Sequence, residues 1–345
     1  MTELITYSGK VIGPHKAVNS AVFGQQTVLT NDPFVYVDLW LRREHQDDAL
    51  FFWRQAGHFY RSATGLPIEA KPLVLYYTFM NAAKALLSSK SIIYSPIHGV
   101  KHHNMRAENS KIVLSNEGVK IREAGVVPAL SSYFAEAEVS TEHSLESMLY
   151  NLVHIHRTFS LTYPHWKDIF APLRNTRFVR DPVTGSTTFA CELVSDVSWA
   201  SYRRILPPNF TATRSVDGIT INSTANVALT SSNALTGNDL QNLSQLNSAV
   251  RASVKYIRGS STLWYLKMKS TRQIQRHQLT LTIAAMHRLS ELSRYKPREL
   301  SSLLNGQKNW LLTEFIEMSP GQFIDQGGAE ITGQQIMVPN VRDPK

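Results

Sequence analysis

The sequence predicts an α+β protein that is predominantly helical, with β hairpins peripheral to two long core helices. Two observations carry this prediction. Apolar residues recur every three or four positions over about residues 72–87 and within 271–295, as in helices with a buried face. Shorter segments flanking turn residues, such as Asp181 to Gly185, indicate hairpins. With 43% hydrophobic and 18% charged residues, the chain has the composition of a folded globular protein.

We expect the 345 residues to form a single large domain, 1–345, with two irregular parts. The first is the N-terminal segment 1–45, in which residues 34–41 are predicted to form a strand. The second is an insertion over residues 209–247 that is rich in Ser, Thr, Asn and Ala. The sequence allows either an ordered β excursion or a mobile loop for this insertion. If the chain has a domain boundary, we expect it there.

Two helices are predicted between these parts. Asp47 or Asp48 caps a helix that continues through Tyr60. Pro72 suits the first turn of the first core helix, because a proline is tolerated there. The buried stripe of this core helix consists of Leu73, Tyr76, Met80, Ala83 and Leu87.

A loop and a hairpin are expected after this helix. The loop covers residues 95–104. The hairpin has one arm at residues 111–114, a turn at 116–118 and a second arm at 119–122. This hairpin would lie at the periphery of the helical core.

The remaining elements follow from similar signals. Ser144 is expected to start a helix, and strands at 177–180 and 187–194 flank the turn at Asp181 to Gly185. Two short amphipathic helices, at residues 310–316 and 323–332, are expected to end the chain.

Positive charge is concentrated in the segment from Arg251 to Arg298. It contains eleven Lys or Arg residues and one acid, Glu291, for a net charge of +10. The whole chain carries +9, so all other residues sum to −1. Such a segment favours an anionic partner, which could be a nucleic acid, an acidic protein or a lipid surface. A solvated basic face with no partner is the alternative.

This segment is predicted to contain a hairpin over residues 254–269 and a long helix over 271–295 that is stopped by Pro297. One face of the second hairpin arm is apolar and the other carries Lys and Tyr side chains. We expect six residues to hold a nucleic-acid backbone or stack on a base: Lys255, Arg258, Tyr265, Lys267, Lys269 and Arg276.

The sequence gives little support for a cofactor or a metal site. The sequence has no Gly-x-Gly-x-x-Gly, P-loop, Gly-x-Ser-x-Gly or His-Glu-x-x-His motif, so we expect no cofactor. Cys191 is the only cysteine, which excludes an intramolecular disulfide and a cysteine-based zinc cluster. His98, His102 and His103 lack an Asp, Glu or Cys at ligand spacing. We interpret them as part of a histidine-rich loop and expect no metal site.

The expected location is the cytoplasm. The N-terminus has no basic region followed by an apolar one, as a signal peptide would have. The most apolar stretches, 72–87 and 279–292, are interrupted by charged residues and fall short of the ~18 apolar residues of a spanning helix. We therefore expect no membrane association.

Several segments together resemble the YaaC-like family of bacterial proteins. They are spread over roughly residues 50 to 335 and match the helix-core patterns of that family. The resemblance implies a shared fold, and it implies no settled biochemical activity. The matching segments are residues 71–87, His98-Gly-Val-Lys101, 289–297 and 310–316.

The pair of core helices also resembles, more loosely, the helical core of HEPN-type proteins, many of which are RNA-cleaving toxins or defence effectors. Their signature is an Arg followed after four to six residues by a His, and Arg272 and His277 match it. The resemblance implies metal-independent RNA cleavage, with His277 as general acid or base and Arg272 stabilising the transition state. Five residues on an ideal helix rotate by about 140°, so the two share a face only if the helix start is distorted. The alternative is a surface arginine beside a helix-start histidine.

These observations predict a nucleic-acid-associated or complex-forming protein, plausibly a bacterial anti-phage defence component with ribonuclease character. Its partners would be RNA or DNA, another protein or a second copy of the chain. The alternative is a non-catalytic structural or interaction subunit whose basic face docks an acidic protein. A nucleic-acid complex would weaken steeply with salt, which distinguishes the two.

Overall fold

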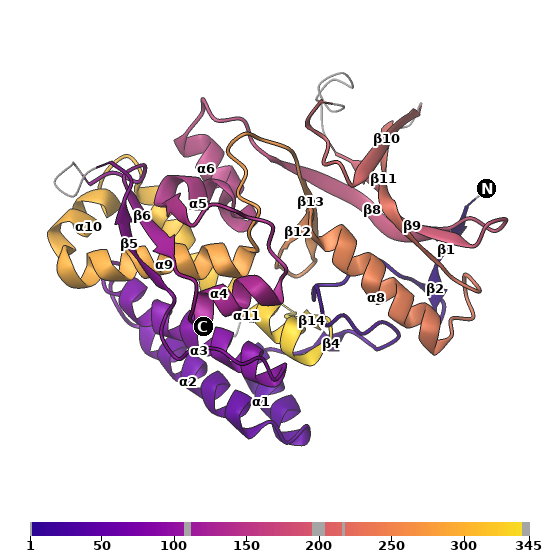
Figure 1. Cartoon of the computed structure of the whole chain (residues 1–345), viewed down its shortest axis with the longest axis horizontal. Helices are drawn as coiled ribbons and strands as arrows, with labels where there is room; N and C mark the ends of the chain where they lie inside the picture. Colours follow the sequence, from indigo (N-terminus) through magenta and orange to yellow (C-terminus); the bar gives the residue numbers. More distant parts are fainter. Residues whose placement is uncertain (1, 107–111, 195–203, 216–217, 340–345) are drawn as a thin grey trace. The chain divides into compact units, whose positions relative to one another are not determined.

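The computed structural model describes residues 2–106, 112–194, 204–215 and 218–339 (Figure 1). Helices account for 43% of the chain and strands for 21%, so the predicted α+β fold with more helix than strand is confirmed. None of the helices in these described ranges is long and apolar enough to cross a membrane.

The chain divides into two compact units, each assembled from segments that are distant in sequence. Unit 1 comprises residues 1–31, 169–271 and 332–345, and unit 2 comprises residues 32–168 and 272–331. Whether they fold together as one large domain stays a prediction.

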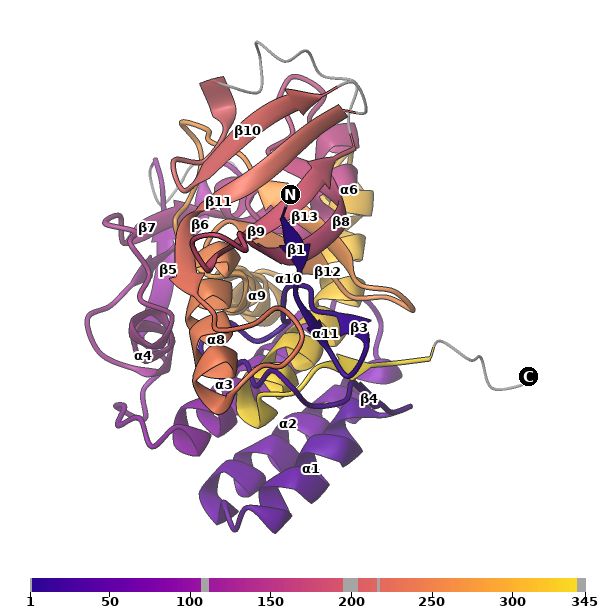
Figure 2. The same ribbon diagram turned by 90° about the vertical axis from the view of Figure 1, so that its right-hand side faces the viewer.

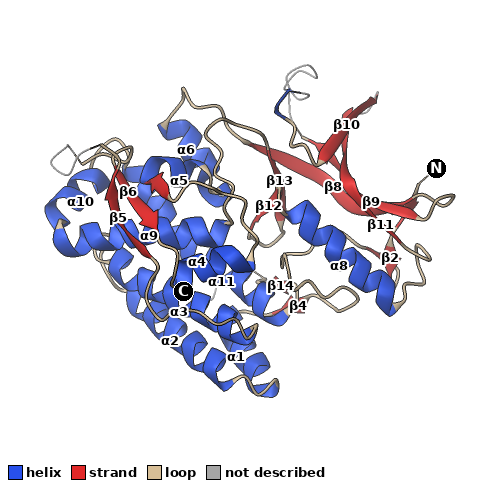
Figure 3. Ribbon diagram, in the orientation of Figure 1, coloured by secondary structure: helices blue, strands red, loops and turns tan. Residues whose placement is uncertain are grey.

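Unit 1 is built on a seven-stranded antiparallel sheet (Figure 3). The strand order is β10-β11-β9-β8-β13-β12, and β1 also pairs with β8. Helix α8 (Gly237–Arg251) packs against β9 and β11. The strands are β1 (Glu3–Leu4), β8 (Phe170–Arg180), β9 (Ser186–Leu193), β10 (Phe210–Ser215), β11 (Gly218–Ala228), β12 (Val254–Ile257) and β13 (Leu263–Lys267).

Short strand pairs complete unit 1. β2 (Thr6–Tyr7) pairs with β3 (Lys10–Val11), and β4 (Val28–Leu29) lies parallel to β14 (Ile336–Met337). The N-terminal segment is therefore irregular only in part.

Two predicted hairpins of unit 1 are confirmed. Strands β8 and β9 flank the turn in which the Gly185 N–H donates to the Asp181 carbonyl at 2.8 Å. Strands β12 and β13 form the hairpin predicted within residues 254–269. For the insertion 209–247, the described residues are ordered as the hairpin β10–β11 and most of α8. The helix was not predicted, although Thr236 and Asp239 form a complete capping box at its start.

Unit 2 is mainly helical. Helix α3 contacts both α2 and α9, so the prediction that the two core helices pack together is confirmed. Helices α1 and α2 lie side by side (Figure 2). The helices are α1 (Pro33–Arg43), α2 (Asp47–Thr64), α3 (Lys71–Ser89), α4 (Val126–Tyr133), α5 (Leu145–Tyr150), η1 (Val153–Ile155), α6 (His156–Thr162), α9 (Gln278–Tyr295), α10 (Pro297–Leu304) and α11 (Asn309–Thr332).

Residues 34–41, predicted as a strand, belong to helix α1. The Asp32 side chain accepts a hydrogen bond from the Phe34 N–H at 2.8 Å, and Pro33 occupies the first turn. The strand prediction was wrong because β-branched and aromatic residues favour a strand only locally, and burial of a helical stripe overrides that preference. The buried side chains of this stripe are Phe34, Val37 and Leu41.

The second core helix begins later than predicted. Residues 271–277 are not helical, and α9 starts at Gln278. The Asn151 side chain holds this segment by donating to the Arg272 carbonyl at 3.0 Å and accepting from the Ile274 N–H at 2.9 Å. The predicted start at 271 was wrong because these long-range side-chain hydrogen bonds satisfy the backbone outside a helix.

The hairpin predicted at 111–122 has a different first arm. Strand β5 (Val100–Asn104), inside the stretch predicted as a loop, pairs with β6 (Glu117–Ile121), which also pairs with β7 (Glu142–Ser144). Ile112 to Leu114 do not form a strand, and Lys111 lies outside the described residues. The polar sequence of β5 lacks the apolar alternation on which the prediction relied. Backbone pairing with β6, and not an apolar face, makes this segment a strand.

The C-terminal part of unit 2 is one helix, α11, where two were predicted. Pro320 lies inside it, although proline removes a hydrogen-bond donor and usually ends a helix. Apolar residues on both sides of the proline are buried, and this burial overrides the local signal. They include Phe315, Ile316, Phe323 and Ile324.

Candidate functional site

The side chains predicted to bind nucleic acid lie mostly in the protein interior. Strand β13 lies between β12 and β8 in the sheet, and its residues 265–267 are buried. Lys255, Tyr265 and Lys267 are 5%, 6% and 3% exposed. Lys269 is exposed, and Arg258 is half-buried. The alternating pattern was found correctly, but both faces of this hairpin are largely covered.

Arg276 is buried in unit 2. Its guanidinium pairs with the Glu136 carboxylate at 3.0 Å, and the two side chains are 6% and 3% exposed. It also donates to His143 Nε2 at 3.0 Å and to the Ser140 carbonyl at 2.7 Å. Arg276 therefore stabilises the interior of unit 2.

Arg272 and His277 have different surroundings. Arg272 is exposed, and its guanidinium lies over the Trp166 ring, 3.8 Å from the centroid. His277 is buried and caps α9, with Nδ1 accepting from the Leu279 N–H at 3.3 Å. These contacts do not bring the side chains of Arg272 and His277 together.

The His277 ring is enclosed on its remaining sides. Phe134 stacks on it with a centroid separation of 3.5 Å, and the Gln326 amide contacts Nε2 at 2.9 Å. Both ring nitrogens thus have neighbours within the protein, an arrangement that fixes the start of α9.

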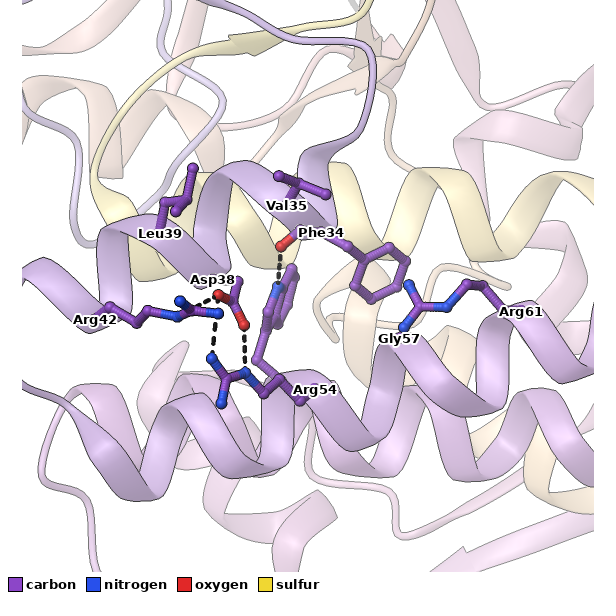
Figure 4. Close-up of a pocket in the computed structure, with 9 residues that line it drawn as sticks. Phe34, Val35, Asp38, Leu39, Arg42, Arg54, Gly57 and Arg61 are labelled. Carbon is purple, nitrogen blue, oxygen red and sulfur yellow. Dashed lines mark hydrogen bonds and ion pairs between the residues drawn. The ribbon is translucent and has the colours of Figure 1, made fainter.

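A hollow opens on the surface between α1 and α2 (Figure 4). Its volume is about 280 Å³. We call it the α1–α2 hollow. Its apolar lining consists of Phe34, Val35, Leu39 and Trp53, and its charged lining consists of Asp38, Arg42, Arg54 and Arg61.

The apolar floor is fixed by packing between the two helices. The Trp53 indole N–H donates to the Phe34 carbonyl at 3.0 Å, and the two rings lie 5.2 Å apart. Both side chains are buried. At the rim, Val35 and Leu39 are 54% and 57% exposed, so the apolar lining continues to the solvent-facing surface of α1.

Asp38 organises two of the three arginines. Arg42 Nε lies 2.8 Å from one carboxylate oxygen of Asp38, and Arg54 Nε lies 2.5 Å from the other. The hydrogen bond to Asp38 raises the pKa of Arg54. These contacts hold two guanidinium groups at the edge of the hollow.

Arg61 is the third arginine, and among the described residues it has no hydrogen bond or ion pair. It lies beside the Phe34 ring, over Gly57 (Figure 4). A Cβ at Gly57 would come within 3.3 Å of Phe34 and 3.4 Å of the Arg61 guanidinium. A glycine inside a helix costs about 1 kcal/mol relative to alanine. Gly57 is therefore best explained by the space it leaves for the Phe34 ring and the Arg61 guanidinium.

The hollow combines an apolar floor with excess positive charge. Three arginines against one aspartate leave a net charge of +2. Such a surface suits a ligand that presents an apolar group flanked by carboxylates. The sequence interpretation missed the α1 side of this hollow because it assigned residues 34–41 to a strand. The signal that would have found them is Asp32-Pro33, a helix cap followed by a first-turn proline.

The histidines of the predicted loop lie on or just before β5. His103 Nε2 is 3.2 Å from Glu142, and His102 Nδ1 is 3.6 Å from Glu291. Among the residues that the structure describes, no three His, Cys, Asp or Glu side chains are placed to hold a metal ion.

Comparison with known families supports the resemblance seen in the sequence. The family model described as "YaaC-like Protein" matches residues 18–331, which is most of the chain. The chain belongs to the YaaC-like family. No curated protein and no solved structure matches it. The matched residues belong to both units and include α1 and α2.

Proposed function

We propose that this YaaC-like protein is a complex-forming protein whose α1–α2 hollow docks an acidic amphipathic helix of a protein partner. The observation that carries the proposal is Arg61, which has no ion pair within the described part of the chain, beside an apolar floor with Val35 and Leu39 exposed at the rim. Helix-in-groove recognition uses apolar anchors at helical spacing, with flanking charges for specificity.

The exposed lining favours a protein segment over a small ligand. Pockets that enclose small molecules usually span about 300–1,000 Å³ and bury most of the ligand surface. The hollow, at about 280 Å³, lies at the lower end of this range, and two of its lining residues, Val35 and Leu39, are exposed. One aliphatic or aromatic side chain suits this volume, while the rest of a partner helix covers the rim. Central anchors of this kind dominate protein–protein binding energies.

The charges favour an acidic partner. Arg42 and Arg54 each share Asp38, so each retains donors for a further carboxylate. Arg61 has no carboxylate partner among the described residues. A basic partner would meet a net charge of +2, whereas a partner with two or more carboxylates would be attracted to it.

Nucleic-acid association, ribonuclease activity and a role in bacterial defence stay predictions. Lys255, Tyr265, Lys267 and Arg276 are buried, and His277 is enclosed by Phe134 and Gln326. Of the residues predicted for these roles, Lys269 and Arg272 are exposed and Arg258 is half-buried. A nucleic acid would need a larger group of cations that reach solvent.

The test is binding of a fluorescein-labelled helical peptide made of Ala, Leu and Glu, with Leu at helical spacing and Glu flanking it. Fluorescence anisotropy with the full-length protein measures its dissociation constant. We expect Arg61→Gln and Leu39→Ser each to weaken binding about tenfold, roughly 1.4 kcal/mol. A peptide with Lys in place of Glu should not bind.

Arg43→Gln is the matched control. Arg43 is exposed at the end of α1 and pairs with Glu44, and it does not line the hollow. Removing its charge changes the net charge of the protein by the same amount as Arg61→Gln. Equal effects of the two substitutions, or no binding of the acidic peptide at millimolar concentration, would refute the proposed docking function.

A further inference from the structure

A cavity of about 680 Å³ lies within unit 1, lined by the β2–β3 hairpin and by the segment that leads to β4. All of its lining residues belong to unit 1, and it shares none of them with the α1–α2 hollow. Its volume falls in the range of about 300–1,000 Å³ that is usual for small-molecule pockets. Among the described residues that line the cavity, Lys10 is a cation and none is an Asp or Glu.

His15 offers one ring nitrogen to this cavity. The residue is 3% exposed, and its Nδ1 accepts a hydrogen bond from the Ala17 N–H at 3.0 Å. The proton of the neutral imidazole is therefore on Nε2. Nε2 has no hydrogen-bond partner within the described ranges, and it is not one of the unpartnered polar atoms that are sealed from solvent. Because His15 lines the cavity, this N–H is a donor available to a ligand there.

Hydrogen bonds to α8 fix the position of His15. The Asn247 side chain accepts from the His15 N–H at 2.8 Å and donates to the Ala17 carbonyl at 2.9 Å. Asn247 is fully buried, and the Phe23 ring meets the imidazole edge to face, with 5.6 Å between the ring centroids. A donor that is already held in one orientation loses little freedom when it binds a ligand. Such rigid support is typical of a binding site.

Tyr7 and Lys10 face each other across the β2–β3 hairpin. They are register partners, so their side chains lie on the same face of the hairpin. Ser8 and Gly9, between them, have φ values of 50° and 78°, as a type I′ turn requires at both central positions. Tyr7 and Lys10 both line the cavity, and neither side chain has a hydrogen bond or ion pair in the part of the chain that the structure describes. The hairpin thus supplies a hydroxyl and an ammonium to one cavity.

The charge of the cavity matches a ligand with a single negative charge. Burial, together with the nearby cations Arg251 and Lys16, lowers the pKa of His15 to about 3. His15 is therefore neutral at pH 7 and acts as a hydrogen-bond donor without a charge of its own. Lys10 then provides a net charge of +1 in the lining. A monoanion neutralises this charge, whereas a cation would be repelled.

We propose that this cavity binds the carboxylate of a small polar molecule, with Lys10 as counter-charge and the Tyr7 hydroxyl and His15 Nε2–H as donors. A carboxylate carries one negative charge, whereas a phosphate monoester carries about 1.5–2 at pH 7. Hydrogen bonds to an ionised acceptor are the stronger kind, so three donors suit this group. The Gln25 side-chain oxygen, also in the lining, accepts from the Gln334 amide at 2.6 Å. The Gln25 NH₂ group remains for polar groups elsewhere on the ligand.

The test uses acetate and 4-hydroxybenzoate as probes, with nuclear magnetic resonance of ¹⁵N-labelled histidine rings in the full-length protein. A carboxylate that accepts from Nε2–H should shift the His15 Nε2 resonance and slow the exchange of its proton. We expect a saturable response to both carboxylates at constant ionic strength and none to 4-hydroxybenzamide, the neutral counterpart. The absence of a His15 response at about 100 mM of either carboxylate, well above a millimolar dissociation constant, overturns the site. An equal response to the benzamide also contradicts it.

Lys10→Gln tests the counter-charge. It should weaken binding of 4-hydroxybenzoate about tenfold, because the carboxylate loses its charged partner. The matched control is Lys269→Gln, which removes an exposed lysine of unit 1 that does not line the cavity and should change the affinity less than twofold. An equal effect of the two substitutions contradicts the proposal, because it would reflect the net charge of the protein alone.

Tyr7→Phe tests the hydroxyl donor. The hydroxyl has no partner among the described residues, so its removal should leave the midpoint of thermal unfolding unchanged. The affinity for 4-hydroxybenzoate should nevertheless fall about tenfold. Unchanged affinity would overturn the assignment of Tyr7 to the site.

Inorganic phosphate decides the class of anion. In competition with 4-hydroxybenzoate at equal ionic strength, phosphate should displace the probe less effectively than acetate, because its second charge has no counter-charge in the lining. Stronger displacement by phosphate than by acetate contradicts a carboxylate site.

Discussion

Arg276 and Glu136 form a buried ion pair in unit 2, with 3.0 Å between Nη1 and Oε2. The Glu136 carboxylate also accepts hydrogen bonds from the His277 N–H at 2.9 Å and the Thr280 hydroxyl at 2.5 Å. These contacts join the segment around Glu136 to the beginning of α9. A buried ion pair is tolerated when further hydrogen bonds satisfy both partners, as they do here.

We predict that Glu136→Ala lowers the free energy of unfolding by about 3–5 kcal/mol, because Arg276 would remain buried without its counter-charge. Urea denaturation followed by circular dichroism measures this change. The control is Glu142→Ala, which breaks the exposed ion pair with Lys120 and should cost about 1 kcal/mol or less. Similar losses for both variants would contradict the structural role of the buried pair.

His277 and Arg272 should differ in their effect on stability. His277→Ala removes the cap of α9 and the ring that stacks on Phe134, so we expect a loss of roughly 1–3 kcal/mol. Arg272→Ala removes an exposed contact with Trp166 that is worth about 0.5–1 kcal/mol. Chemical denaturation tests the difference. If both folded variants instead lost an RNA-cleaving activity present in the wild type, the catalytic prediction would replace this structural one.

Helical periodicity was enough to predict the core of unit 2. The stripe from Leu73 to Leu87 lies on α3, and α9 contacts α3 as expected. Periodicity is reliable here because the buried faces are long and regular. It failed for α1 and α11, in which β-branched residues and Pro320 gave local signals that burial overrides.

Neither the α1–α2 hollow nor the ring contact between Tyr76 and His287 could be predicted from spacing in the sequence. Tyr76 and His287 are brought together only by the packing of α3 against α9. The charge composition favoured a partner-binding role for Lys255 and Lys267, but both side chains are buried. A count of charges carries no information on burial. The burial of these two lysines depends on what covers the faces of β12 and β13 in the fold, which the spacing of the sequence does not show.

Acid should destabilise the protein well above the pH at which carboxylates titrate. Burial lowers the pKa of His15, His154 and His287 to about 3 and that of His143 to about 4. A lowered pKa means that the unfolded chain binds protons first, so stability is full above about pH 6.5 and falls toward pH 4. Each such histidine contributes a slope of about 1.4 kcal/mol per pH unit.

This pH dependence is measured by urea denaturation between pH 7 and pH 4.5. His154→Gln removes one of the four groups and should reduce the slope by about one proton, provided that the variant folds. His58→Gln, which makes the same substitution at an exposed histidine, serves as the control. A wild-type stability that does not change over this range would refute the account.

Gly57→Ala should weaken peptide binding in the hollow without lowering the stability of α2. Alanine favours a helix by about 1 kcal/mol over glycine, and the contacts with Phe34 and Arg61 are tight but adjustable. We therefore expect unchanged or slightly higher thermal stability together with weaker binding of the acidic peptide. Calorimetric unfolding and fluorescence anisotropy measure the two quantities, and unchanged binding would show that the space over Gly57 is not used.

The central claim is that Arg61 recognises carboxylates beside the apolar floor of the hollow, and a charge exchange tests it most directly. Arg61→Glu is measured by fluorescence anisotropy with the Glu-containing peptide and with its Lys-containing counterpart. The account predicts that Arg61→Glu weakens binding of the Glu-containing peptide at least about tenfold and strengthens binding of the Lys-containing peptide. If Arg61→Glu binds the Glu peptide as tightly as the wild type does, the hollow is not the docking site.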